Sequence, residues 1–158
     1  MDDFLNALVI MSELFSKDYQ FALATAVNNT PSVRFIDTYF DGKCFYFVSN
    51  EKSQKVKELR TNPKVALSSR KSYYFSGNAY NIGHPLLPEN ERLRETLTKE
   101  FCKWYFEHNN EDDETMCYIK IEPIFGFFHK NGTGYKIDFK NKSVEMFPFD
   151  FVINLTEE

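Results

Sequence analysis

The sequence has few of the residues that hold small secreted or metal-dependent domains together. Its three cysteines, Cys44, Cys102 and Cys117, are an odd set and show no CxxC or CxxxC spacing. Such a set provides neither a disulfide framework nor a zinc-knuckle motif. We therefore expect three reduced thiols, as in a cytoplasmic protein.

Glycine and proline are also scarce. Six of each in 158 residues exclude collagen-like and low-complexity chains. No apolar run approaches the roughly 20 residues that cross a bilayer, and the N-terminus opens Met-Asp-Asp, without the basic start of a signal peptide. The net charge of −4 gives no overall basic footprint for nucleic acid. We expect a cytoplasmic protein whose partners include neither membrane nor nucleic acid.

Aromatic residues, in contrast, are abundant. The chain holds 17 Phe, 9 Tyr and 1 Trp, too many for a disordered protein. A length of 158 residues favours one domain, spanning 1–158, that folds without a disulfide or metal. The aromatic surplus indicates either an aromatic-rich core or a dimer interface, since aromatic residues are enriched in both.

Hydrophobic periodicity predicts helices and strands in alternation. Apolar residues recur at steps of three and four over residues 3–16, which indicates a helix that faces the core. Runs rich in β-branched and aromatic residues indicate strands, and Asp41-Gly42 is a hairpin signal. The predicted helices are 3–16, 53–60 and 89–108, and the predicted strands are 20–27, 32–40, 43–49, 64–69, 73–82, 116–129, 135–139 and 143–147.

Short connections and a few punctuating residues indicate how these elements are arranged. The first three strands are expected to form an antiparallel meander. Gly77 predicts a bulge or a close backbone approach, and Pro123 predicts an edge position or a kink in its strand. The order favours a mainly β, α+β fold: an antiparallel barrel decorated by an N-terminal helix, a short helix and one long helix.

Residues 34–55 hold the polar side chains of greatest functional interest. A helix N-terminus has unpaired N–H groups and a partial positive charge, so it attracts anions. Arg34, on the second predicted strand, adds a forked guanidinium suited to phosphate if it points to the same end of the barrel. These residues indicate either a site for a phosphate-sized anion or a capped helix with solvated lysines. The turn into the short helix carries Ser49, Asn50, Lys52, Ser53 and Lys55.

The ordered motifs from Phe21 to Leu67 resemble the N-terminal half of the split-barrel flavin-binding family that includes pyridoxamine 5′-phosphate oxidase. The segments that carry the resemblance are FALATAV, Pro31, VRFID, the Asp41-Gly42 turn, FVSN, SQKV and NPKVAL, in that order. The segment Phe75–Ala79 resembles the next strand of that family. The resemblance implies a split β-barrel that binds FMN as a homodimer, with the flavin at the interface.

The resemblance also implies roles for individual residues. In such proteins an Arg on the second strand, with a Ser and basic residues at the short helix, holds the flavin phosphate. These functions fall on Arg34, Ser53 and Lys55. Gln54 stands where members of the family commonly have Arg, which removes one charge from the phosphate site.

Two further segments correspond to the environment of the flavin ring. The segment that runs along the isoalloxazine ring matches Phe35, Ile36 and Asp37. The pair at the end of the third strand matches Val48 and Ser49.

The resemblance implies an FMN-dependent oxidoreductase. We expect two electrons to pass from a reduced donor, such as a nicotinamide cofactor, through FMN to a small acceptor. No side chain is assigned as a general acid or base. Oxidation of pyridoxamine phosphate itself is not expected, because residues 147–155 lack the Arg and His residues with which that enzyme grips its substrate.

Two alternatives stay open beside this interpretation. In the first alternative, the protein is a flavin carrier or sensor without turnover. In the second, it is a split barrel that has lost flavin and binds haem or a protein partner. No metal site is predicted, because His84, His108 and His129 show no HxH or HExxH spacing.

Overall fold

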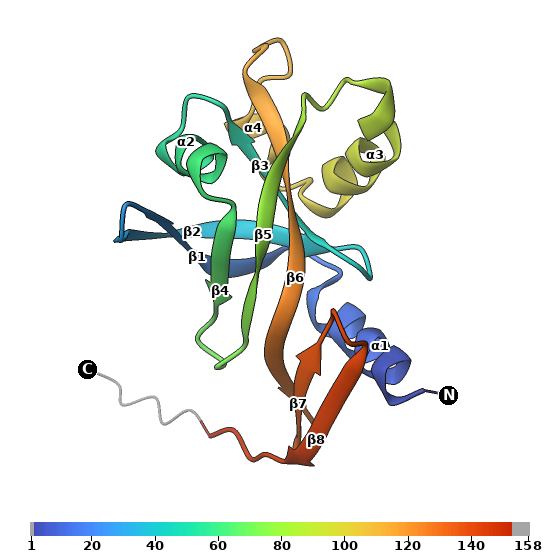
Figure 1. The fold of residues 1–158 in the computed structure, drawn as a ribbon. Coiled ribbons are helices and arrows are strands. Elements are labelled where there is room, and N and C mark those ends of the chain that lie inside the picture. Colours follow the sequence, from blue (N-terminus) through green and yellow to red (C-terminus); the bar gives the residue numbers. More distant parts are fainter. Residues whose placement is uncertain (1, 153–158) are drawn as a thin grey trace, which may run out of the picture.

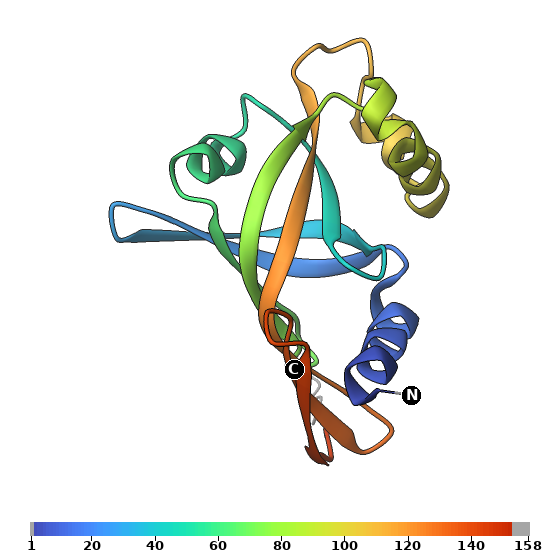
Figure 2. The ribbon, with the colours of Figure 1, turned by 45° about the vertical axis from the view of Figure 1, so that its right-hand side comes forward.

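The computed structural model describes residues 2–152, which form a barrel with helices at its ends and sides (Figures 1 and 2). Strands pair in the order β3-β2-β1-β4-β5-β6-β7-β8, and an additional β3–β6 pairing closes the first six into a barrel. All the pairings are antiparallel. The predicted fold class, an antiparallel split barrel of the α+β type, is confirmed.

The elements follow the predicted order with small shifts of their ends. The helices are α1 (Asp3–Phe15), α2 (Gln54–Thr61), the short 3-10 helix η1 (Pro88–Asn90), α3 (Glu91–Glu100) and α4 (Tyr105–His108). The strands are β1 (Tyr19–Val27), β2 (Thr30–Phe40), β3 (Phe45–Asn50), β4 (Lys64–Ser68), β5 (Tyr74–Gly83), β6 (Met116–Lys130), β7 (Thr133–Asp138) and β8 (Ser143–Pro148). No helix in residues 2–152 is both long and apolar enough to cross a membrane.

The expected meander of the first three strands is only partly formed. β1 pairs along its whole length with β2, up to Thr38, through a turn in which Asn28 and Asn29 both have positive φ. β3, in contrast, pairs with β2 at two positions and with β6 at six, from Phe45↔Ile121 to Asn50↔Met116. β3 therefore leaves the hairpin at once and serves mainly to close the barrel.

Pro123 marks the point where β6 changes its neighbour. On one side, β6 pairs with β3 up to Ile121 and with β7 from Phe125 onward. Pro123 has no N–H to donate and lies in the unpaired gap between these two ladders. On its other side the register with β5 shifts between Ser76 and Gly77, as predicted for Gly77. The strand thus tolerates proline in its middle because no ladder bond is required there.

The one long helix expected over residues 89–108 is divided in the structure. η1, α3 and α4 cover this segment, and residues 101–104 form turns between α3 and α4. Leu97, Phe101 and Tyr105 keep their helical spacing and are fully buried, as predicted for one apolar face. At this break the Nε1–H of Trp104 donates to Asp18, the residue before β1, at 2.7 Å.

The aromatic surplus lies mainly inside the barrel. Phe15, at the end of α1, is fully buried and closes one end of the aromatic core. Aromatic pairs at such distances add to the free energy gained from burial. Five rings surround it with centroids 5.0–5.9 Å away, namely Tyr19, Phe21, Phe45, Tyr73 and Phe75.

Replacing Phe15 by Ala tests this core. We expect the free energy of unfolding to fall by about 3–5 kcal/mol, because the surrounding rings cannot collapse into the space. The control is Phe106→Ala, since Phe106 is 61% exposed, and a change within about 0.5 kcal/mol is expected there. Urea unfolding measures both, and equal losses would contradict a core centred on Phe15.

Candidate functional site

A cavity of about 460 Å³ lies on the side of the barrel where β2 and β3 meet the start of α2 and the end of α4. We call it the β2–β3 cavity. The structure brings five of the nine predicted site residues into its lining, together with three that were not predicted. The lining residues are Phe35, Ile36, Asp37, Val48 and Lys55, with Trp104, His108 and Asn109.

The alternation of β2 decides which of its side chains face outward. Arg34 and Ile36 point toward the barrel interior and α2, whereas Phe35 and Asp37 lie on the outer face. Phe35 is 70% exposed, an unusual position for a phenylalanine. The cavity is therefore bordered by an apolar side chain that the described chain leaves uncovered.

The N-terminus of α2 lies at the border of this cavity, because Lys55, the second residue of the helix, belongs to the lining. Ser53 is the N-cap, and its hydroxyl accepts from the Val56 N–H at 3.4 Å. Its Oγ also lies 3.2 Å from Oγ of Ser49, so the two predicted serines touch. The first N–H groups of a helix have no partner within it, which leaves those of Gln54 and Lys55 for a ligand.

Lys55 is the cation of the cavity. It is half-buried, and no ion pair to it occurs within residues 2–152. Burial lowers its pKa, and the nearby charge of Arg34 lowers it further. Both effects would be relieved by a bound anion, so Lys55 is suited to hold one.

Arg34 is engaged by partners that the sequence did not reveal. Its Nη1 donates to the Thr25 hydroxyl at 2.7 Å, and its Nη2 lies 3.2 Å from Oε2 of Glu58, which is buried. Nothing in the local pattern singled out Glu58, since a lone Glu on a short helix is usually solvated. Arg34, like Ser49 and Ser53, does not line the β2–β3 cavity itself, but its side chain remains 24% exposed beside the lining residue Phe35.

Gln54 occupies a different side of α2. Its side chain is exposed and donates to Oε1 of Glu58 at 3.0 Å. It borders a separate hollow of about 340 Å³ together with Ser32 and Lys57. The structure therefore places Gln54 outside the β2–β3 cavity, in contact with the residue that holds Arg34.

The wall formed by Trp104, His108 and Asn109 depends on a buried polar network. The Tyr105 hydroxyl lies 2.6 Å from that of Tyr118 on β6 and donates to Glu111 at 3.2 Å. Glu111 also accepts two bonds of 2.6 Å from Arg94. These contacts fix α4 against β6 and thereby place His108, which the sequence indicated only as a helix end.

One carboxyl group of the cavity lining, that of Asp37, lies beside a second one, that of Asp18. Burial raises the pKa of Asp37, and the charge of Asp18 and a hydrogen bond with it raise that pKa further. Asp18 is itself held by Trp104. Asp37 thus retains a proton more readily than an isolated carboxyl group does.

Thiol and metal chemistry have little support here. Cys117 pairs with Ser49 in the sheet, but it is fully buried and its pKa is raised to about 12, so the thiol stays protonated. Within the described part of the chain, no group of three or more His, Cys, Asp or Glu side chains is arranged to hold a metal ion.

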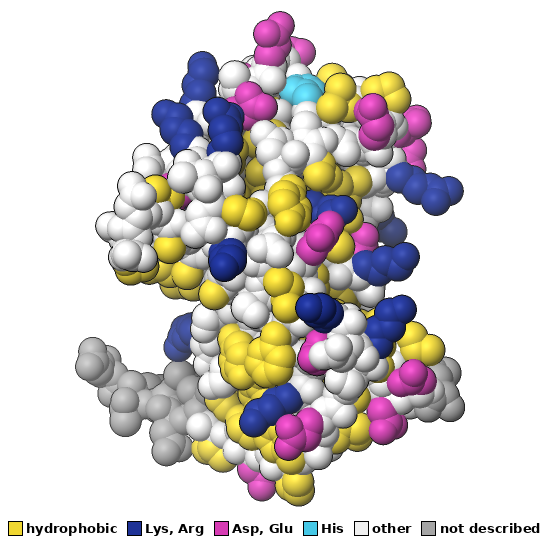
Figure 3. Space-filling view, in the orientation of Figure 1, with side chains coloured by type: hydrophobic (Ala, Val, Ile, Leu, Met, Phe, Trp, Pro, Cys, Tyr) yellow, Lys and Arg dark blue, Asp and Glu magenta, His cyan; other side chains and the backbone are white. Residues whose placement is uncertain are grey.

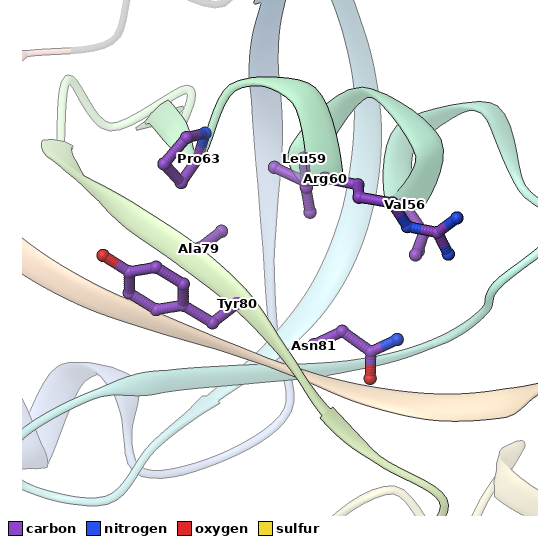
Figure 4. Close-up of a pocket in the computed structure, with 7 residues that line it drawn as sticks. All are labelled: Val56, Leu59, Arg60, Pro63, Ala79, Tyr80 and Asn81. Atoms are coloured by element: carbon purple, nitrogen blue, oxygen red, sulfur yellow. The ribbon is translucent and has the colours of Figure 1, made fainter.

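A further hollow, of about 280 Å³, lies between α2 and β5 (Figure 4). Its lining combines apolar side chains with Arg60 and Asn81, and none of the predicted site residues borders it. The β2–β3 cavity therefore remains the candidate site. The residues of this hollow are Val56, Leu59, Arg60, Pro63, Ala79, Tyr80 and Asn81.

Comparison with known proteins shows the family to which the chain belongs. The family model described as pyridoxamine 5′-phosphate oxidase matches residues 11–126. No curated protein sequence matches the chain.

Several solved structures share the fold. General stress protein 26 from Bacillus anthracis is 18% identical with a TM-score of 0.58, covering 91% of this chain and 99% of its own. An FAD-binding protein from Mesorhizobium loti is 16% identical with a TM-score of 0.53, covering 73% and 88%. The haem storage protein HutZ from Vibrio cholerae is 12% identical with a TM-score of 0.59, covering 78% and 91%. Such low identities show the fold alone.

The carboxyl pair gives a testable pH dependence of stability. Because the folded-state pKa of Asp37 is raised, its contribution is favourable at low pH and is lost as the pH rises through that pKa. We expect Asp37→Asn to raise the melting temperature at pH 7.5, with the difference shrinking toward pH 4. Thermal unfolding followed by circular dichroism measures this. The exposed Asp112→Asn is the control, and a pH-independent effect of Asp37→Asn would contradict the prediction.

Proposed function

Because the chain belongs to the pyridoxamine 5′-phosphate oxidase family, we propose that it binds FMN at the β2–β3 cavity and works as an oxidoreductase. The observation that carries the proposal is Lys55, a half-buried cation in this cavity with no acidic partner within residues 2–152. It lies beside the unpaired N–H groups of α2. A phosphate group would satisfy both.

The residues present fit a flavin nucleotide in two respects. The donors at the N-terminus of α2, with Ser53, Lys55 and the spare N–H groups of Arg34, match a phosphate. The cavity volume of about 460 Å³ is in the usual range for small-molecule sites. Lys and Arg side chains also gather around α2 on the molecular surface, although the whole chain is acidic (Figure 3).

Bound FMN would supply the redox chemistry, by accepting a hydride from a reduced donor and passing electrons to a small acceptor. The chain's own residues would bind and orient it. β2 would run along the ring through Phe35, Ile36 and Asp37, and Val48 would border it from β3. The raised pKa of Asp37 would let its carboxyl group hold a proton more readily at the edge of the cavity.

The substrate is proposed to differ from pyridoxamine phosphate. Residues 147–152 contain no Arg or His that could grip a substrate phosphate, and residues 153–155 of the same tail lie outside the described part of the chain. A flavin carrier without turnover is the second candidate, because the described part of this tail, residues 147–152, offers no cationic grip for a substrate phosphate. Steady consumption of NADH or NADPH by the FMN-loaded protein would exclude it.

We also propose that two copies form a homodimer through the outer face of β1, β2 and β4. Val33 and Phe35 protrude from β2 and are 69% and 70% exposed. Across the ladders, Phe35 neighbours Ala22, and Val33 neighbours Ala24, which in turn pairs with Ala66. Large side chains beside a flat row of small ones make a self-complementary surface, and a partner there would cover the exposed edge of the cavity.

FMN binding is tested by a visible spectrum of the purified protein after loading and desalting. We expect a retained flavin spectrum, and a titration in which Lys55→Ala weakens FMN by roughly 10–150-fold while riboflavin changes little, because a charge-assisted phosphate contact is lost. Lys57→Ala, an exposed lysine of the same helix, is the control.

Three results would count against FMN binding at this site. A colourless protein after loading would overturn the proposal that it binds FMN. A haem spectrum would show that the protein binds haem instead. Equal losses of FMN and riboflavin in Lys55→Ala would place the phosphate elsewhere.

The dimer is tested by Phe35→Asp. We expect the wild type to sediment as a dimer and the variant to dissociate at least roughly 100-fold more readily, because an unpaired charge would be buried at the interface. Phe106→Asp places the same charge on another exposed phenylalanine and should leave the dimer intact. A monomeric wild type would refute the dimer. A Phe35→Asp variant that stays dimeric would show that the interface does not lie on this face.

A further inference from the structure

Glu58 is a buried carboxylate on α2 that contacts Arg34, one of the proposed phosphate-binding residues. A negative charge here is unexpected, because it repels a phosphate group. Only 8% of its side chain is exposed. Both of its oxygens are used: Oε1 accepts from Gln54 Nε2 at 3.0 Å, and Oε2 receives the Thr25 hydroxyl and Arg34 Nη2, the latter at 3.2 Å. Burying a charge is costly unless it is paired and hydrogen-bonded, and here it is both.

The network around Glu58 holds the guanidinium of Arg34 from two sides. Thr25 accepts from Nη1 at 2.7 Å while donating its own hydroxyl proton to Glu58. Each terminal nitrogen of Arg34 therefore has one fixed partner. A guanidinium carries five N–H donors, so three remain after these two bonds. Glu58 thus orients Arg34 and still leaves N–H donors of the guanidinium available for a ligand.

Glu58 also changes the charge that a ligand would meet. Arg34 adjoins Phe35 on β2, and Phe35 lines the same cavity as Lys55. Burial lowers the pKa of Lys55, and so does the charge of Arg34. The two cationic side chains together carry two positive charges. The carboxylate removes one of these. The remaining positive potential comes from one net charge and the N-terminus of α2.

We propose that Glu58 is a specificity-determining and positioning residue of the phosphate subsite. It fixes the guanidinium of Arg34 for contact with the ligand's phosphate, and it limits how strongly the subsite attracts that phosphate. The site thereby binds a flavin phosphate with directed hydrogen bonds rather than with charge alone. This inference rests on the proposed binding of FMN.

Two substitutions separate the positioning effect from the charge effect. Glu58→Gln removes the charge and keeps the shape, since Gln54 can turn its amide to face the new side chain. Glu58→Ala removes the charge and also the acceptor that holds Arg34. Flavin fluorescence titrations of FMN and riboflavin give the ratio of their dissociation constants for each protein.

We expect Glu58→Gln to tighten FMN by roughly tenfold and to leave riboflavin within about twofold, because only FMN carries the charge that Glu58 repels. Glu58→Ala should tighten FMN less than Glu58→Gln does, because Arg34 is then free to move. The matched control is Glu13→Gln, which removes the same charge from α1 at the opposite end of the barrel (Figure 1). It should leave the ratio unchanged.

Thr25→Val gives a test in the opposite direction. It keeps the charge of Glu58 but removes the hydroxyl that links it to Arg34, so FMN should weaken while riboflavin does not. This variant decides the question even if Glu58→Gln fails to fold.

The outcomes distinguish the inference from the function on which it rests. A wild type that binds neither flavin overturns the proposed function and the inference together. A wild type that binds FMN, with an unchanged ratio in Glu58→Gln and Thr25→Val, overturns the inference alone. Equal ratios in Glu58→Gln and Glu58→Ala would also overturn it, because Glu58 would then act through charge without positioning Arg34.

Discussion

The pairing of β3 with β6 is the constraint on which the rest of the structure depends. These strands are far apart in the sequence, yet six residue pairs join them, against two between β3 and its hairpin partner β2. This pairing closes the barrel and brings the start of α2, which follows β3, beside the segment that precedes β6. The start of α2 supplies one wall of the candidate site, and the segment before β6 supplies another. Without the closure, Lys55 and Trp104 would not border the same cavity.

The electrostatics of the site follow from this arrangement. The chain has a net charge of −4, but the N-terminus of α2, Lys55 and Arg34 make one locally positive region. Glu58 moderates it from the buried side of α2 and gives Arg34 a fixed partner. A buried ion pair of this kind adds little to the stability of a fold, because desolvation of two charges offsets their attraction. Its value lies in the direction that it gives to the guanidinium.

Much of the fold was predictable because local patterns and the final topology agree. The burial of alternate residues in β1, the double-asparagine turn and the Ser53 cap are short-range features. The break between α3 and α4 was not predictable from the local pattern. Trp104, at the break, donates to Asp18, which lies 86 residues earlier in the chain. Likewise, the tolerance for Pro123 follows from two strands that end and begin beside it.

For the candidate site, the sequence by itself determined the family, the fold class and the donor set at the start of α2, because each is encoded in short, ordered motifs. The tertiary structure alone decided which of these residues share a cavity. It turned Gln54 away from that cavity, paired Arg34 with Glu58 through Thr25, and supplied Trp104, His108 and Asn109 as the opposite wall. The physical reason is that side-chain neighbours across a closed barrel are set by strand register and helix packing. No local run of residues carries that information.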